Sequence, residues 1–333
     1  TILVTTTLLL ISCSPTINAD KKGVYNEQLN QQYWTANFSP DDKLIAVAGV
    51  DSLLRIYHSK NLKLYQNYAI NSWIHCVKWN PDGNSLAIAT LDNYVLLLNM
   101  QNGQLTQLKS TGGSRAIGWN HNGEILAVAD LDGAIILWNK NGTLLRNMEN
   151  KNGPEVAGSA YLALDWHPTK NIFVATNFKI SVFDPSGHEL KTMQHTNPAA
   201  IMLCVKWHPS GSYFVIGDYG HNWNNENVPT LLHFWSSDGI LIKSVAGSRA
   251  EIRNMAWNKN GTLLATASDV LRVWNNNGEL LHQSAPDGTN NLWGIDWSKK
   301  GDKIVTASRY KTVALWDSTA KLLKKIEGLR SGK

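Results

Sequence analysis

Residues 252–281 read IRNMAWNKNGTLLATASDVLRVWNNNGELL. The stretch holds four short apolar runs: a first ending at Trp257, a second at Leu263–Ala267, a third ending at Trp274 and a fourth at Glu279–His282. Asn-Gly pairs separate the first run from the second and the third from the fourth, and both residues tolerate the positive φ that tight hairpins need. The stretch therefore predicts one small sheet of four antiparallel strands.

The same unit recurs along almost the whole chain. A first anchor residue, which ends the first strand of each unit, falls at Phe38, Trp79, Trp119, Trp166, Trp207, Trp257 and Trp297. A second anchor, which ends the third strand, falls at Tyr57, Leu98, Trp138, Phe183, Trp235, Trp274 and Trp316. Seven units of about 40 residues predict an all-β fold, a seven-bladed β-propeller of four-stranded antiparallel blades over residues 33–328. Residues 322–326 supply the fourth strand of the last blade, and residues 24–29 are a candidate for an outer strand that closes the ring.

The period and the two registered anchors resemble the WD40 repeat family. Trp316-Asp317 is the one literal Trp-Asp pair on a second anchor, and the family's Gly-His pair ahead of each first strand is missing. The internal hydrogen-bond set that depends on this pair is therefore not expected. Asp51, Asp92 and Asp132 each lie six residues before a second anchor, and we interpret them as turn residues that bond to nearby backbone amides.

Composition and motifs argue against several function classes. The formal net charge of +5 is spread along the chain, and nucleic-acid binding needs a basic stripe that this sequence lacks. The sequence contains no nucleophile elbow, zinc-protease motif, P-loop or dinucleotide fingerprint, so no catalytic residue and no cofactor is predicted. Cys76 and Cys204 occupy equivalent positions in the second and fifth units, too far apart for a disulfide, so both are predicted to be buried free thiols. No Cys or His spacing indicates a metal.

The first residues carry a different pattern. Residues 1–12, TILVTTTLLLIS, are apolar but too short to span a bilayer, and Leu10-Ile11-Ser12-Cys13 resembles the lipobox of bacterial lipoproteins. We expect residues 1–12 to be part of a signal peptide and Cys13 to be lipidated. Residues 13–32 then form a tether, and residues 329–333 a polar tail. Ser14 is typical of lipoproteins sent to the outer membrane, and a cytosolic N-terminal extension is the alternative.

Four of the 14 tryptophans lie off the anchor positions: Trp34, Trp73, Trp223 and Trp293. Trp34 and Trp293 precede a first anchor by four residues, which we call the minus-four position, and Trp73 precedes one by six. These positions begin the innermost strands of neighbouring blades, near one rim of the channel. Arg115 and Arg253 are also minus-four residues, and aromatic residues beside arginines are typical of binding hot spots. Packing of each tryptophan beneath a neighbouring loop is the structural alternative.

Two long insertions point to the same face. Residues 149–160 join the third and fourth blades, and residues 218–229, which include Tyr219 and Trp223, join the second and third strands of blade five. Long loops on a rigid scaffold are common recognition elements. The sequence therefore predicts a non-enzymatic protein-binding scaffold, a lipoprotein of an outer-membrane or secretion assembly that faces the periplasm. One alternative is a cytosolic adaptor. Another is a propeller enzyme or small-ligand-binding protein with a site at the channel mouth.

Overall fold

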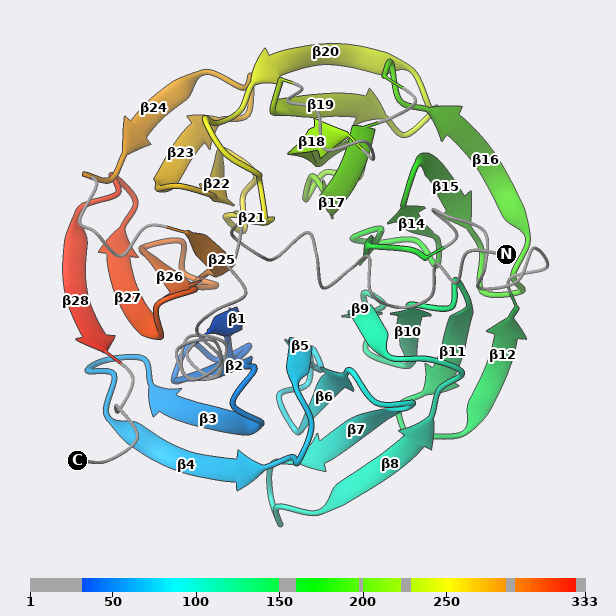
Figure 1. Cartoon of the computed structure of the whole chain (residues 1–333), viewed down its shortest axis with the longest axis vertical. Helices are drawn as coiled ribbons and strands as arrows, with labels where there is room; N and C mark the ends of the chain where they lie inside the picture. Colours follow the sequence, from blue (N-terminus) through cyan, green and yellow to red (C-terminus); the bar gives the residue numbers. More distant parts are fainter. Residues whose placement is uncertain (1–31, 150–159, 198–199, 223–228, 286–290, 328–333) are drawn as a thin grey trace, which may run out of the picture.

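The computed structural model of the chain describes residues 32–149, 160–197, 200–222, 229–285 and 291–327. These residues form seven four-stranded antiparallel sheets arranged in a ring (Figure 1). Within each sheet the strands follow one another in chain order, from the central axis to the outer edge. The predicted seven-bladed propeller of four-stranded antiparallel blades is confirmed.

Each blade takes four consecutive strands of the described chain. Blades one and two consist of β1 (Tyr33–Phe38), β2 (Leu44–Gly49), β3 (Leu53–His58), β4 (Leu64–Ala69), β5 (Ile74–Trp79), β6 (Ser85–Thr90), β7 (Tyr94–Asn99) and β8 (Leu105–Lys109). Blades three and four consist of β9 (Ser114–Trp119), β10 (Ile125–Asp130), β11 (Ile135–Asn139), β12 (Leu144–Met148), β13 (Ala163–Trp166), β14 (Phe173–Thr176), β15 (Lys179–Phe183) and β16 (Glu189–Gln194). Blade five consists of β17 (Ala200–Trp207), β18 (Tyr213–Asn222), β19 (Leu231–Ser236) and β20 (Leu241–Ala246). Blades six and seven consist of β21 (Asn254–Trp257), β22 (Leu263–Ala267), β23 (Leu271–Asn275), β24 (Leu280–Gln283), β25 (Leu292–Trp297), β26 (Lys303–Ser308), β27 (Thr312–Asp317) and β28 (Leu322–Glu327).

The hairpin turns differ from the expectation in one respect. In the turn after Trp257 only Gly261 has a positive φ, at 73°, and its N–H donates to the carbonyl of Asn258 at 3.0 Å. This is a type I turn followed by one left-handed residue, so Asn260 needs no positive φ. Blade one uses Asp42, with φ of 61°, where blades two, three, five, six and seven use glycine.

The first-anchor tryptophans join neighbouring blades. The indole Nε1 atoms of Trp79, Trp119 and Trp166 donate to backbone carbonyls of the preceding blade, at 2.8–3.2 Å. His167 and His208 lie in the turns after two first anchors and place Nε2 3.1 and 2.8 Å from the carbonyl oxygens of Gly211 and Gly261 in the next blade. The repeat thus fixes the contacts between blades as well as the strands.

Blades one and seven meet without sharing a strand among the described residues. Asp296 in β25 accepts the backbone N–H of Phe38 at 2.9 Å, and the Asp42 carboxylate accepts the N–H groups of Lys299 and Lys300 at 2.6 and 2.9 Å. The predicted fourth strand of blade seven is present as β28, whereas residues 24–29 lie outside the described part of the chain.

The three turn aspartates are only partly as expected. Asp51 lies 3.4 Å from the N–H of Leu53, but its carboxylate chiefly pairs with Arg55 and with Lys311 of blade seven, at 2.7 and 3.2 Å. Asp92 takes part through its backbone carbonyl, which accepts from the Thr90 hydroxyl at 3.3 Å.

In blade three the carboxylate of Asp130 binds backbone amides, whereas the role expected of Asp132 stays a prediction. Asp130 is buried and accepts from the N–H groups of Gly112 and Ala134 at 3.2 and 2.8 Å. Asp130 is the last residue of β10, and its side chain points toward these amides. The spacing from the second anchor does not reveal the direction of a side chain.

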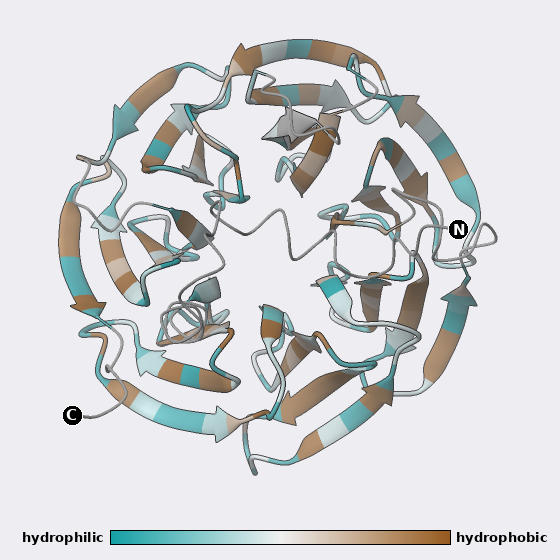
Figure 2. Cartoon of the chain, viewed as in Figure 1, coloured by the Kyte–Doolittle hydropathy of each residue, from teal (hydrophilic) through white to brown (hydrophobic). Residues whose placement is uncertain are grey.

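Burial and hydropathy change from the inner to the outer strands of each blade. The second strands of the blades are almost wholly buried, whereas outermost strands such as β4 and β24 are mostly exposed and alternate in character (Figure 2). The seven hydrophobic clusters lie mainly between adjacent blades, as in the cluster that joins Phe234 of blade five to Trp274 of blade six. In the described residues no helix has the length and apolar character needed to cross a bilayer.

Candidate partner-binding face at the channel rim

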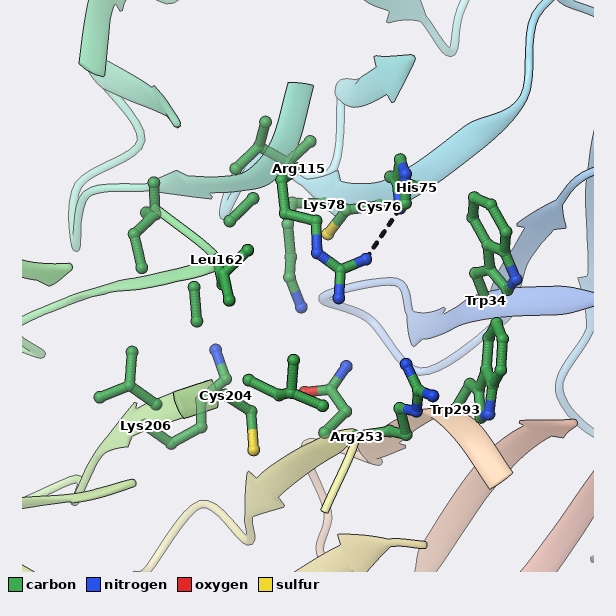
Figure 3. A pocket seen from close by; sticks show the side chains of 17 residues that line it. Trp34, His75, Cys76, Lys78, Arg115, Leu162, Cys204, Lys206, Arg253 and Trp293 are labelled. Atoms are coloured by element: carbon green, nitrogen blue, oxygen red, sulfur yellow. Dashed lines mark hydrogen bonds between the residues drawn. The ribbon is translucent and has the colours of Figure 1, made fainter. Parts of the chain in front are cut away.

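All seven minus-four residues line one cavity on the central axis (Figure 3). They are Trp34, His75, Arg115, Leu162, Leu203, Arg253 and Trp293. In five blades this residue is the extra one of a β-bulge; Trp34, for example, is skipped between the pairs Tyr33–Gly49 and Thr35–Ala48. A bulge changes the direction of a side chain relative to its strand. The bulges therefore explain why this position faces the channel in successive blades.

Six of the residues proposed from the sequence form a continuous arc around this rim. Trp34 lies 5.9 Å from Trp293 and 6.0 Å from Trp73 between ring centroids. The guanidinium of Arg253 stacks over Trp293 at 4.4 Å and over Tyr219 at 5.3 Å. At the other end of the arc, Arg115 reaches His75, which stacks on Trp34. We call Trp34, Trp73, His75, Arg115, Tyr219, Arg253 and Trp293 the rim arc.

The ends of the rim arc are fixed by hydrogen bonds. Arg115 donates from Nη1 to Nδ1 of His75 at 3.0 Å (Figure 3), and Arg253 pairs with Glu251 at 2.9 Å. Burial and the neighbouring Arg115 hold the pKa of His75 well below its usual value. His75 is therefore a neutral ring that accepts a hydrogen bond from Arg115 at Nδ1 and stacks on Trp34, which places the guanidinium in the channel mouth.

The members of the arc differ in exposure. Trp293 is only 6% exposed because Arg253 and Trp34 cover it, whereas Trp34 and Trp73 are half-buried. Trp293 therefore supports the arc more than it presents a surface. Trp223 and Cys13 lie outside the described residues, and the role of the arc in partner binding stays a prediction.

A second set of polar side chains, one residue before five of the seven first anchors, was not recognised from the sequence. Lys206 pairs with Asp165 at 2.5 Å, and Lys78 donates to Asn37 at 2.7 Å. Burial alone lowers the pKa of Lys206, but Asp165 outweighs it and holds this pKa above its usual value. Both lysines line the cavity, and the described lining residues include four cations and no carboxylate. Comparing this position across all units would have revealed the pattern.

The two cysteines also lie at the cavity. Both are free, as predicted, but only Cys204 is buried, because it packs against Ile252, with Sγ 3.3 Å from the carbonyl oxygen of that residue; Cys76 is half-buried, contrary to the prediction. Burial raises the pKa of the Cys204 thiol to about 12. The Cys204 thiol is therefore not activated, since a thiolate needs a lowered pKa.

The insertion of blade five begins as strand. Residues 218–222, predicted as loop, continue β18, and Ala200 pairs with Asn222 at its end. Asp218 is consequently buried, close to His195 and His233. No motif spacing joins these three residues, so the search for metal-binding Cys and His spacings did not reveal them.

Comparison with known families agrees with the repeat. The family described as "WD domain, G-beta repeat" matches residues 104–139, 235–275 and 278–317, and the "Anaphase-promoting complex subunit 4 WD40 domain" matches residues 36–114. The segment 235–275 runs from the third strand of blade five to the third strand of blade six, so the sequence repeat is offset from the blade.

Curated relatives match over part of the chain. The F-box-like/WD repeat-containing protein TBL1X of Homo sapiens is 27% identical over 139 residues, which cover 38% of this chain and 23% of that protein. TBL1Y of Homo sapiens is 26% identical over 139 residues, covering 38% of this chain and 26% of the relative. The chain thus spans about a quarter of the length of the curated relatives that it matches.

Proposed function

We propose that this chain, which carries WD40 repeats on a seven-bladed propeller, is a protein-binding scaffold that recognises its partner with the rim arc. WD40 propellers typically act as protein-interaction scaffolds and generally are not enzymes. The observation that carries the proposal is the contact of Trp34 with Trp73 and Trp293, flanked by Arg115 and Arg253. Aromatic and arginine side chains at the centre of a contact face supply most binding energy in protein interfaces.

The charge of the cavity narrows the chemistry of the partner. Lys78, Arg115, Lys206 and Arg253 line it, and no carboxylate does among the described lining residues, while Asp165 and Glu251 pair with Lys206 and Arg253 from outside the lining. We infer that the partner presents an acidic side chain or a C-terminal carboxylate at the channel mouth, with apolar side chains packed on Trp34 and Trp73. Complementary charge of this kind speeds association, so binding should weaken as ionic strength rises.

Substitution of the half-buried tryptophans tests the face. We expect Trp34→Ala and Trp73→Ala to lower affinity for the purified partner by about 30-fold or more, the loss of a hot-spot residue. Tyr65→Ala is the matched control, because Tyr65 is an exposed aromatic residue on the outermost strand β4. Calorimetric titration of folded variants measures the effect. Equal affinities of both rim variants and wild type would overturn the assignment of this face.

We also propose that a lipid on Cys13 anchors the propeller at the bacterial outer membrane as a subunit of an envelope or secretion assembly. The support is the apolar run that ends in Leu10-Ile11-Ser12-Cys13. Metabolic labelling with radioactive palmitate should mark the wild type and not Cys13→Ala. An unlabelled wild type contradicts the anchor and leaves the partner-binding face untouched, so the two proposals fail separately.

A second candidate function is the binding of a small anion within the channel, and the four-cation lining favours it. A dicarboxylate such as succinate would then raise the melting temperature of the full chain in a saturable way. Arg115→Gln should remove this shift. Absence of any shift at millimolar succinate would leave the protein partner as the ligand of this face.

A further inference from the structure

Three buried side chains converge between blades four and five. His195 follows β16 of blade four, whereas Asp218 and His233 lie in β18 and β19 of blade five. Their exposed fractions are 5%, 2% and 0%. Within the described part of the chain this is the one group of three or more His, Cys, Asp or Glu side chains whose ligand atoms converge.

The ligand atoms form a small triangle. Nε2 of His195 lies 2.8 Å from Nε2 of His233, and these two nitrogens lie 3.2 and 2.9 Å from the carboxylate oxygens of Asp218. Tetrahedral coordination with bonds of about 2.0–2.2 Å places ligand atoms about 3.3–3.5 Å apart. The three side chains therefore need to separate by only a few tenths of an ångström to hold an ion.

The outer nitrogens of both imidazoles have oxygen partners. Nδ1 of His195 lies 2.8 Å from the carbonyl oxygen of Asn197, and Nδ1 of His233 lies 2.7 Å from the hydroxyl of Ser244. Metal-binding histidines usually donate their other N–H to such a group, which turns the lone pair of Nε2 toward the metal. The N–H of Asn197 also lies 2.9 Å from Nδ1 of His195, so this histidine is satisfied in either tautomer, with or without a metal.

Carboxylates of other blades have different partners. Asp130, which is buried in blade three, accepts from backbone N–H groups, and Asp269 of blade six, which is partly exposed, pairs with Arg272 and the hydroxyl of Ser248. Backbone N–H groups and a guanidinium can only donate, so they cannot serve as metal ligands. The partners of Asp218 are instead two imidazoles, His195 of blade four and His233 of blade five, whose Nε2 atoms serve as donors or as metal ligands.

We propose that His195, Asp218 and His233 bind a divalent transition metal, Zn²⁺ by ligand class. Two imidazole nitrogens and one carboxylate are a common zinc ligand set, and the fourth position remains for water or another group. The ion would connect the outer part of blade four to blade five. It would also stabilise the start of the blade-five insertion, because Tyr219 of the rim arc follows Asp218 directly.

Titration of the metal-stripped full chain with Zn²⁺ tests the proposal. We expect one equivalent to bind and the melting temperature to rise in a saturable way, as for any ligand that binds only the folded state. Co²⁺ should give visible d–d absorption with the same stoichiometry. A chain that binds no stoichiometric Zn²⁺ and shows no thermal shift overturns the site.

Variants locate the site. His195→Gln and His233→Gln should each abolish the Co²⁺ absorption and the thermal shift, and Ser244→Ala should weaken affinity by about 10- to 100-fold as an outer partner. His167→Asn is the matched control: His167 bridges the same two blades through Gly211 but lies outside the cluster, so its variant should bind Zn²⁺ like wild type. Unchanged zinc binding in both ligand variants would place the ion elsewhere and refute the assignment.

Discussion

Blades five and six begin from the same unit and differ at one end. Each has a first anchor tryptophan, Trp207 or Trp257, and a second, Trp235 or Trp274. In blade six the two inner strands span four and five residues, whereas in blade five they span eight and ten. The additional residues of blade five extend the hairpin at the end that carries the rim arc.

The two blades also differ in the partners of the carboxylate that follows the second strand or lies within it. The carboxylate of Asp269 in blade six is neutralised locally by Arg272, three residues away. The carboxylate of Asp218 in blade five meets two imidazoles, one of them from blade four. Blade six thus pairs this carboxylate within the blade, whereas the carboxylate of blade five has a partner from the neighbouring blade.

The largest expected effect is a loss of stability on removal of the second anchor tryptophan, which both blades have. Trp235→Ala and Trp274→Ala should each destabilise the fold by about 3–5 kcal/mol, because each buried indole packs against the preceding blade. Chemical denaturation measures the change. A cost below about 1 kcal/mol in one blade would mean that the two anchors are not equivalent.

The second largest effect is expected from packing beside the innermost strand, where the two blades carry different residues. Gly217 of blade five takes the place of Ala267 in blade six, and a Cβ there would lie 2.8 Å from Sγ of Cys204 and from Cγ2 of Ile252. Gly217→Ala should therefore cost about 1–3 kcal/mol through overpacking. The double variant Cys204→Ala/Gly217→Ala should recover part of this loss in thermal denaturation. A neutral single variant would show that blade five has room for the blade-six residue.

A smaller difference is expected from single hydrogen bonds. Nε1 of Trp274 donates to the Thr266 hydroxyl at 3.0 Å, whereas Nε1 of Trp235 meets no acceptor in the described structure. Trp274→Phe should be more destabilising than Trp235→Phe by about 1 kcal/mol, the net contribution of one hydrogen bond. Equal losses in urea denaturation would indicate that Trp235 also has a partner, such as water.

The smallest effect concerns pH. Burial would raise the pKa of Asp269, but hydrogen bonds from Arg272 and Ser248 outweigh it and hold this pKa at about 2. Because the unfolded carboxyl takes up its proton at a higher pH, the pair stabilises the fold fully above about pH 4 and loses this effect as pH falls to about 2. The melting-temperature difference between wild type and Asp269→Asn should therefore shrink from pH 5 to pH 2. A constant difference would contradict the lowered pKa.

Much of the candidate site followed from the repeat. Trp34, Trp293, Arg115 and Arg253 share one position in the period, and the structure places that position on one cavity. The charged residues one position before four of the first anchors, Lys78 and Lys206 among them, were missed, although the same alignment contains them. Asp130 was missed for another reason, since its role depends on the direction of a side chain at a strand end.

The sequence by itself determined the ring: a period of about 40 residues with two anchors leaves one way to bury the tryptophans, between blades. Departures from that period also identified the rim arc. Only the tertiary structure decided which side chains meet across blades. His195 and His233 are 38 residues apart and belong to no common motif. They converge on Asp218 because blade five extends its hairpin beside blade four, and such a meeting depends on the positions of two sheets and not on spacing within one.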